Sequence, residues 1–162
     1  MQRVGSTGLA VIRNALDSVT DIMSVTLVNT ARSASTRLGW DFSSAILSAD
    51  GELIGQGLSQ PLHLAGMVPA IQGCLDRYKG RIYPGDIIAN NDPYEGGSHL
   101  PDINMIRPVF VDGELIAFVA NRAHYPDVGG LAPGSFAGGI GLGGFFVDDA
   151  AFVQIFLLLF FR

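Results

Sequence analysis

The stretch PVFVDGELIAFVA, residues 108–120, decides the fold class of this chain. Two apolar runs flank Asp112-Gly113, and an Asp-Gly pair between two strand-like runs is a strong signal of a β-hairpin. The same pattern occurs earlier, where DFSSAIL (41–47) and ELIG (52–55) flank the turn-like residues 48–51. Two hairpins of this kind predict a mostly antiparallel sheet.

Two helices are predicted outside these hairpins. In residues 8–30, apolar side chains recur at alternating spacings of three and four residues, which places them on one side of a helix. This stripe, which we expect to belong to the core, consists of Leu9, Ile12, Leu16, Val19 and Met23. Residues 65–78 have a helical pattern that ends at Lys79-Gly80. With a short buried strand at 87–89, the predicted fold class is α+β, a long N-terminal helix and a second packed helix accompanying the sheet.

Composition excludes several classes of function. The chain has 162 residues, of which 48% are apolar and 15% charged, so it can form one domain with a core. Its net charge is −5 and it has no Lys/Arg cluster, so we expect no nucleic-acid binding. The single cysteine, Cys74, excludes an intrachain disulfide, and we interpret it as a small buried residue. The N-terminus does not have the pattern of a signal peptide, so we expect a cytoplasmic protein.

Potential metal ligands concentrate in two polar segments. The first is NNDPYEGGSHLPD, residues 90–102, and the second is NRAHYPD, residues 121–127, which follows the second hairpin. Segments that close two neighbouring strands can face one another across one sheet edge, so we expect them to be close in space. Imidazole and carboxylate groups suit Zn, Mn or Fe. From residue types alone, a second interpretation stays open, in which the histidines are structural and the Asn-Asp-Pro sequence only shapes turns.

The block NDPYEGGSHLPDINMIRPVFVDGELIAFVANRAHYPDVGG, residues 91–130, resembles the signature region of the hydantoinase B/oxoprolinase family, which includes the acetone carboxylase alpha subunits. Upstream, the segments VIRNALDSV, DFSSAI, PLHLAGM and PGDIIANNDPY follow the order of the family. We therefore expect residues 1–135 to form the N-terminal portion of a hydantoinase B-like domain. Many relatives carry a histidine at the position of Tyr125, and this departure leaves the implied ligand set intact.

The resemblance implies a metal-dependent enzyme subunit that works with an ATP-using partner. In this family, a hydantoinase A-like subunit uses ATP to phosphorylate the carbonyl or enol oxygen of the substrate. The B-type subunit carries the metal centre at which the activated species is attacked. The outcome is hydrolysis of a cyclic amide or carboxylation of a ketone. We expect the hydrolase, in a hetero-oligomer, with a ketone carboxylase subunit and a non-catalytic remnant as the alternatives.

The divalent metal, expected to be Zn, Mn or Fe, has an implied set of ligands in this sequence. The family's ligand positions fall on His99, Asp102 and His124, and Asp41 matches a further acidic position near the metal. Independently of the resemblance, neutral imidazoles and a carboxylate leave a divalent ion Lewis-acidic enough to lower the pKa of a bound water. Coordination positions left to water are typical of a catalytic rather than a structural site.

Three residues are candidates for catalytic roles: Asp41, His63 and Asp127. His63 lies in PLHLAGM and matches a motif histidine of the family, which implies a place in the substrate pocket. A carboxylate that opens an apolar strand is costly unless it is partnered, which favours a role for Asp41. Asp127 has two interpretations. It lies three residues after His124 and either orients an imidazole of the site or is a turn residue before Gly129-Gly130.

The last part of the chain, residues 136–162, has no counterpart in the resemblance. We expect it to reflect a truncated or frame-shifted gene product, so that the domain is incomplete. Its apolar run, residues 150–161, is shorter than the ~20 residues of a spanning helix, so we expect no membrane insertion. A G-x-G-x-x-G pattern at 139–144 lacks a preceding strand and a following helix, so we expect no dinucleotide site.

Overall fold

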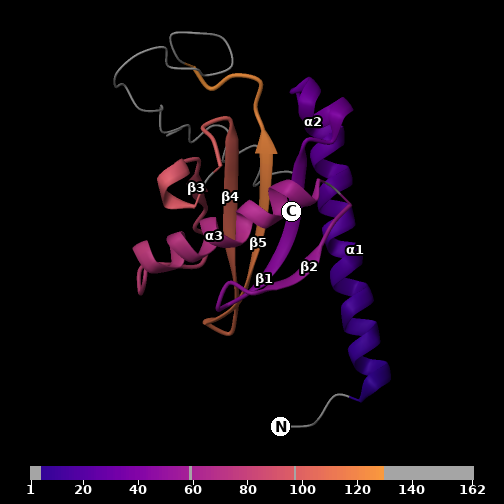
Figure 1. The fold of residues 1–162 in the computed structure, drawn as a ribbon. Coiled ribbons are helices and arrows are strands. Elements are labelled where there is room, and N and C mark those ends of the chain that lie inside the picture. Colours follow the sequence, from indigo (N-terminus) through magenta and orange to yellow (C-terminus); the bar gives the residue numbers. More distant parts are fainter. Residues whose placement is uncertain (1–4, 59, 97, 130–162) are drawn as a thin grey trace.

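A computed structural model describes residues 5–129 of this chain, with the exception of residues 59 and 97 (Figure 1). Its elements are α1 (Ser6–Thr30), α2 (Ala34–Gly39), β1 (Phe42–Ser48), β2 (Leu53–Gln56), α3 (Pro61–Arg77), β3 (Ile88–Asn90), the 3-10 helix η1 (Pro93–Glu95), β4 (Asp102–Val111) and β5 (Glu114–His124). The predicted α+β class is confirmed. Our expectations for the tail, residues 136–162, lie outside the described residues. None of the described helices is long and apolar enough to cross a membrane.

The strands form one antiparallel sheet in the order β2-β1-β5-β4-β3, and both predicted Asp-Gly hairpins are present. Between β4 and β5, Asp112 and Gly113 have φ values of 51° and 83°. Positive φ at both central residues is what a two-residue hairpin turn requires. The hairpin is longer than predicted, because β4 begins at Asp102 and β5 ends at His124, and these two residues pair directly. Two expected metal ligands therefore lie on strands rather than in loops.

Helix α3 crosses one face of the sheet and covers an apolar core (Figure 1). The buried members of this core are Ala45, Leu47, Met67, Ile71, Cys74, Ile106, Phe118 and Ala120. The rows of this face nearer the start of β4 are polar. There, Arg122 pairs with Ser43 on one side and Asn104 on the other, and Asp102 and His124 form the next row. One face of the sheet thus changes from an apolar core to a polar cluster along its length.

Helix α3 begins at Pro61, four residues before the predicted start at residue 65, so that boundary was wrong. Pro61 takes the first helical turn, where the missing N–H costs nothing and the fixed φ suits a helix. The earlier start places His63 in the first turn of α3, where it is 7% exposed. The end of the helix at Arg77, with Gly80 at positive φ, agrees with the predicted stop.

Helix α1 is present as predicted, but its apolar stripe does not belong to the core. Leu9, Ile12 and Val19 are 64%, 48% and 44% exposed, and of the stripe only Met23 is buried. Figure 1 shows the first turns of α1 running past the lower end of the sheet, where the hairpin turns lie. The predicted role of the stripe was therefore wrong for most of its members.

The side of α1 that packs against the sheet is instead small and polar. Thr20 and Ser24 are fully buried, and their hydroxyls donate to carbonyls of the preceding turn. A Cβ at Gly57, directly after β2, would collide with the Ser24 hydroxyl and lie 2.6 Å from the carbonyl oxygen of Thr20. Close packing of the helix on a glycine decides which side faces inward, and hydrophobic periodicity does not reveal such a contact.

Candidate metal centre

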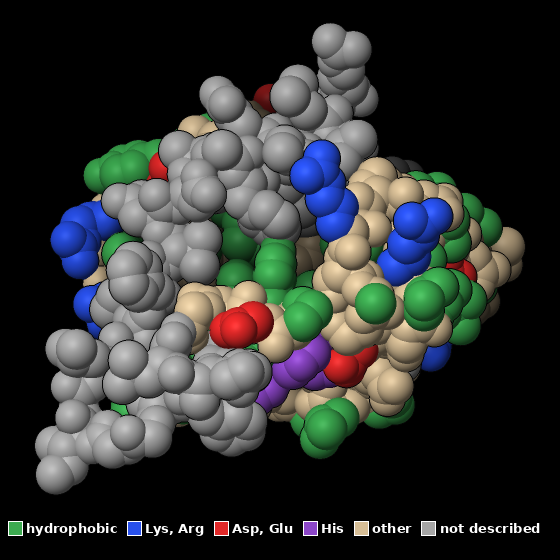
Figure 2. Space-filling view, turned by 90° about the horizontal axis from the view of Figure 1, so that it is seen from above, with side chains coloured by type: hydrophobic (Ala, Val, Ile, Leu, Met, Phe, Trp, Pro, Cys, Tyr) green, Lys and Arg blue, Asp and Glu red, His purple; other side chains and the backbone are tan. Residues whose placement is uncertain are grey.

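Three predicted ligands meet at the upper end of the sheet, where β4 begins and β5 ends. One ligand atom from each of His99, Asp102 and His124 lies within 4.8 Å of the other two. Asp102 and His124 face each other across the β4–β5 ladder, and the Asp102 N–H donates to the carbonyl of His99 at 3.0 Å. The two imidazole rings stack with centroids 5.0 Å apart. Seen from above, histidine side chains lie beside acidic ones on this surface (Figure 2).

The backbone of His124 is fixed by an element that we did not predict, the short helix α2. The hydroxyls of Ser35 and Thr36 donate to the His124 carbonyl at 3.1 and 3.2 Å. On the other side, the His124 N–H donates to the Asp41 carbonyl at 3.0 Å. These contacts hold the end of β5 in place, so the imidazole projects from a rigid support.

The Asp102 carboxylate is the centre of the cluster and is 3% exposed. Its Oδ2 accepts hydrogen bonds from the Ser98 hydroxyl and, at 3.0 Å, from Nη2 of Arg122. Nδ1 of His99 also lies 3.0 Å from Oδ2, whereas Nδ1 of His124 lies 3.1 Å from Oδ1. A buried carboxylate is stable only with such partners. Oδ2 of Asp102 thus contacts Ser98, Arg122 and His99, whereas Oδ1 contacts His124.

Ionisation of Asp102 is favoured despite its burial. Burial raises the pKa of this carboxyl, but the contacts with His63, Ser98 and His124 outweigh it and hold the pKa well below its usual range. The carboxylate is therefore charged at neutral pH and suited to hold a cation.

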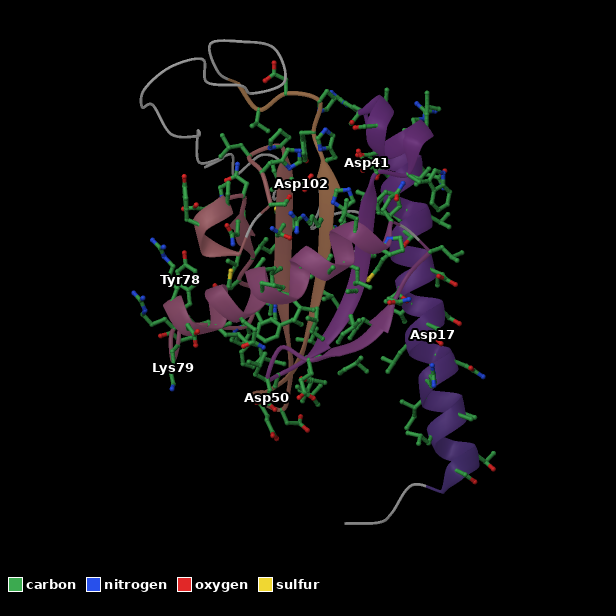
Figure 3. All side chains as sticks on the ribbon, viewed as in Figure 1. Asp17, Asp41, Asp50, Tyr78, Lys79 and Asp102 are labelled. Atoms are coloured by element: carbon green, nitrogen blue, oxygen red, sulfur yellow. The ribbon has the colours of Figure 1, made fainter. Side chains whose placement is uncertain are left out.

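His63 joins two carboxylates that the sequence did not link. Its Nε2 donates to Oδ1 of Asp41 at 2.6 Å, and its Nδ1 lies 3.5 Å from Oδ2 of Asp102. The nearby Asp102 carboxylate raises the pKa of His63, burial opposes this, and the Asp41 contact adds to the rise. Asp41 thus has a partner, and it contacts the three-residue cluster through His63. Figure 3 shows Asp41 and Asp102 at the same end of the sheet.

Asp127 lies outside this cluster. Its side chain is exposed, and its Oδ1 accepts a hydrogen bond from the Gly129 N–H at 2.9 Å. This contact is typical of a turn residue and favours the second of the two interpretations that the sequence left open. A role in orienting an imidazole stays a prediction. In the polar loop, Asn91 and Asp92 bond to the backbone at Leu100 and Tyr94, which agrees with turn-shaping.

Arg122 is the residue of the centre that we did not predict. It is 1% exposed and forms an ion pair of 3.0 Å with Asp102. A signal was present in the sequence, because alternate residues of a strand share a face and Arg122 lies two residues before His124. A cation on the face that buries Phe118 and Ala120 needs a buried anion, and Asp102 is that anion.

The donor set fits a divalent transition metal. Two imidazoles and a carboxylate make up a common catalytic ligand set, and three protein ligands leave positions for water or substrate. The side chains that would hold the ion are His99, Asp102 and His124. His124 and Asp102 stand on paired strands. The backbone carbonyl of His124 accepts a hydrogen bond from Ser35, and the Asp102 carboxylate accepts one from Arg122, which restricts the orientation of that carboxylate.

Comparison with known proteins shows the family of the chain. The sequence model described as hydantoinase B/oxoprolinase matches residues 6–139. The chain belongs to this family. As a member of the hydantoinase B/oxoprolinase family, it is 41% identical over 133 residues to the uncharacterized protein MJ0963 of Methanocaldococcus jannaschii, covering 80% of this chain and 24% of that one. It is 37% identical over 136 residues to the caprolactamase subunit beta of Pseudomonas jessenii, covering 84% and 23%.

A third relative, 5-oxoprolinase PfmaA of Pestalotiopsis fici, is 39% identical over 122 residues, covering 75% of this chain and 10% of the relative. The crystal structure of the ATP-dependent caprolactamase from Pseudomonas jessenii matches with a TM-score of 0.75 and 29% identity, covering 98% and 29%. A nucleotide-free acetone carboxylase structure matches with a TM-score of 0.70 and 26% identity, covering 78% and 17%. This hydantoinase B-type chain thus spans from about a tenth to about a quarter of the length of these sequence relatives.

Proposed function

We propose that this chain carries the metal-binding part of an ATP-dependent cyclic amidohydrolase of the hydantoinase/5-oxoprolinase type. The observation that carries the proposal is the group formed by His99, Asp102 and His124 on a family scaffold. Relatives named 5-oxoprolinase and caprolactamase support a lactam or related cyclic amide as the substrate class.

A divalent metal held by the three ligands would supply Lewis acidity and lower the pKa of a bound water. Residues of this chain would then accept the proton that the bound water loses. His63 lies between Asp102 and Asp41, so one ring nitrogen faces the centre and the other faces a carboxylate with a half-exposed side chain. A proton that leaves the centre can pass through His63 to Asp41 and reach solvent. This path gives His63 and Asp41 the general acid–base roles expected of them.

ATP enters the proposal through a partner subunit. Hydrolysis of an amide is difficult because the amide carbon is a weak electrophile, and phosphorylation of its oxygen makes that carbon more electrophilic, so that water can add before the ring C–N bond breaks. The ATP-dependent caprolactamase, whose beta subunit is a relative of this chain, supports a hydantoinase A-like partner that performs this step. The activated substrate would then meet the metal centre of this chain in a hetero-oligomer.

A ketone carboxylase subunit is the second candidate, favoured by the match to the acetone carboxylase structure. Both reactions need an activated oxygen and a metal centre, so the geometry of the centre suits either. Incubation of the complete complex with ATP and either a lactam or acetone plus bicarbonate distinguishes them. Ring opening without carbon incorporation supports the hydrolase, and labelled bicarbonate in the product supports the carboxylase.

The test of the proposal is metal binding by the purified chain. After treatment with a chelator, titration with Zn²⁺ or Mn²⁺ is expected to show one site per chain, which His99→Ala and His124→Ala each abolish. Asp50→Asn, at the opposite end of the sheet, is the control and is expected to bind like the parent chain. A folded parent chain that binds neither metal would contradict the proposal and favour the alternative of a non-catalytic remnant.

A further inference from the structure

Arg122 is a buried cation with an incomplete set of partners. Its Nη2 donates to Oδ2 of Asp102, but its Nε and Nη1 have no hydrogen-bond partner within the described part of the chain. A guanidinium that is 1% exposed and bonded on one side only is costly to bury. The burial of such a group is not explained by a gain in folding stability, which points to a functional explanation in its contacts.

The neighbours of Arg122 in the sheet do not complete its hydrogen bonds, and the buried Oδ1 of Asn104 also has no hydrogen-bond partner among the described residues. Ser43, on β1, donates its hydroxyl to the Gln60 carbonyl at 2.6 Å. Asn104, on β4, donates its side-chain amide to the Asn90 carbonyl at 3.0 Å. Among the described residues, Asp102 is the one charge partner that Arg122 has, so the guanidinium and this carboxylate act as a unit.

Gly66 makes the space in which the guanidinium lies. A Cβ at this position would overlap Nη1 of Arg122 and lie 3.0 Å from Cζ. Glycine is a poor residue for the middle of a helix, and α3 tolerates it there for a packing reason. Since Arg122 has almost no exposed surface, a larger side chain at position 66 would displace its guanidinium from its present position.

Helix α3 therefore contacts the carboxylate in two ways from successive turns. His63 lies beside Oδ2 of Asp102, and three residues later Gly66 supports the arginine that donates to the same oxygen. Ser98 and His99 also contact Oδ2, whereas Oδ1 faces His124. The carboxylate cannot rotate without breaking contacts to three different segments.

We propose that Arg122, seated against Gly66, is a positioning residue that fixes the orientation of the Asp102 carboxylate toward the two histidines. The proposal rests on the proposed function in one respect, since it takes Asp102 to be a metal ligand. Gly66 is part of the device because its hydrogen atom leaves room for the guanidinium. Contacts behind a metal ligand commonly change metal affinity by about 10- to 100-fold when they are removed.

Two variants keep the net charge of the centre and change only its geometry, Gly66→Ala and Arg122→Lys. Each is expected to weaken Mn²⁺ or Zn²⁺ binding by about 10- to 100-fold, measured by competition with a chromophoric chelator. The double variant is expected to bind no more weakly than Arg122→Lys alone, because Gly66 acts through Arg122. Gly39→Ala is the control, since this helical glycine has open space where a Cβ would be, and it is expected to bind like the parent.

A readout without metal separates this proposal from the proposed function. In the ¹⁵N NMR spectrum of the chelator-treated chain, the Arg122 Nη groups are expected to show slow rotation, which Gly66→Ala makes fast. A parent chain with a slowly rotating Arg122 but no metal affinity would overturn the metal site and support the positioning. Fast rotation in the folded parent, or additive losses of affinity in the double variant, would overturn the positioning. If Gly66→Ala fails to fold by circular dichroism, Arg122→Lys alone decides, and unchanged affinity in it overturns the proposal.

Discussion

Aspartates stand at both ends of this sheet, and the two ends use them differently. Asp50 and Asp112 are exposed and lie in the hairpin turns at the lower end, where Asp112 helps the backbone reverse direction. Asp102 is buried at the upper end among a serine, an arginine and three histidines (Figure 3). The same side chain is a turn former where water solvates it and a candidate ligand where protein cations surround it. Burial and partners, rather than residue type, decide its role.

The largest effect is expected from removing the carboxylate charge at the upper end of the sheet, compared with removing one at the lower end. Asp102→Asn leaves the Arg122 guanidinium buried without a counter-charge, so we expect a loss of about 3–5 kcal/mol in the free energy of unfolding and a loss of metal binding. Asp50→Asn changes an exposed side chain and is expected to alter stability by less than about 0.5 kcal/mol. Urea unfolding of both variants measures the contrast. Similar losses for the two variants would contradict the distinction between the ends.

The lower end was predictable from the sequence because its structure is local. An Asp-Gly pair between alternating apolar residues specifies a hairpin without help from the rest of the chain, and both hairpins formed where expected. The error in helix α1 has the opposite origin. Its inward side was set by the fit of Thr20 and Ser24 to Gly57, a contact between separate elements that periodicity does not encode.

The upper end was predictable only in part, because its structure also depends on contacts between separate elements. The three candidate ligands came from the family resemblance, and the structure brings them together. Their supports come from four segments, so short sequence patterns did not reveal them. Arg122 could have been suspected from its place on a buried face, but its fit against Gly66 depends on how α3 crosses the sheet. The hydroxyls of α2 on the His124 carbonyl likewise needed the fold.

A pH titration is expected to sharpen the comparison through His63. Its pKa is raised above 6.5, so its stabilisation is complete below that pH and is lost as pH rises through the raised value. The pKa of Asp102 is lowered from 3.8, so its stabilisation is present above that pH and is lost as pH falls. The metal-free chain is therefore expected to be most stable between roughly pH 4 and 6.5. Thermal unfolding across pH 3–9 measures this.

The alkaline decline of stability belongs to His63 alone if this assignment is correct. His63→Gln is then expected to flatten the curve above pH 6.5, because glutamine keeps polar contacts but does not titrate. An undiminished alkaline decline in the His63→Gln variant would show that another group controls it.

A change in the apolar rows tests whether stability and metal binding are separable. Ile106 is 1% exposed in the core beneath α3, two residues further along β4 than Asn104. Ile106→Val is expected to cost about 0.5–1.5 kcal/mol through the methylene group that it removes. Metal affinity is expected to stay within twofold of the parent, because the polar rows keep their contacts. A tenfold loss of affinity in a folded variant would mean that the two parts of the face are coupled.

The smallest effect is expected at the turn between β4 and β5. Asp112 has a φ of 51°, a conformation that asparagine adopts as readily as aspartate. Asp112→Asn is therefore expected to change the free energy of unfolding by less than about 0.5 kcal/mol, whereas Asp112→Val, whose branched side chain resists positive φ, is expected to cost at least about 1 kcal/mol. Urea unfolding separates the two variants. Neither is expected to change metal affinity, because this turn lies at the end of the sheet opposite Asp102. Weaker metal binding in Asp112→Asn would mean that the register of the hairpin, and with it the pairing of Asp102 with His124, depends on the turn.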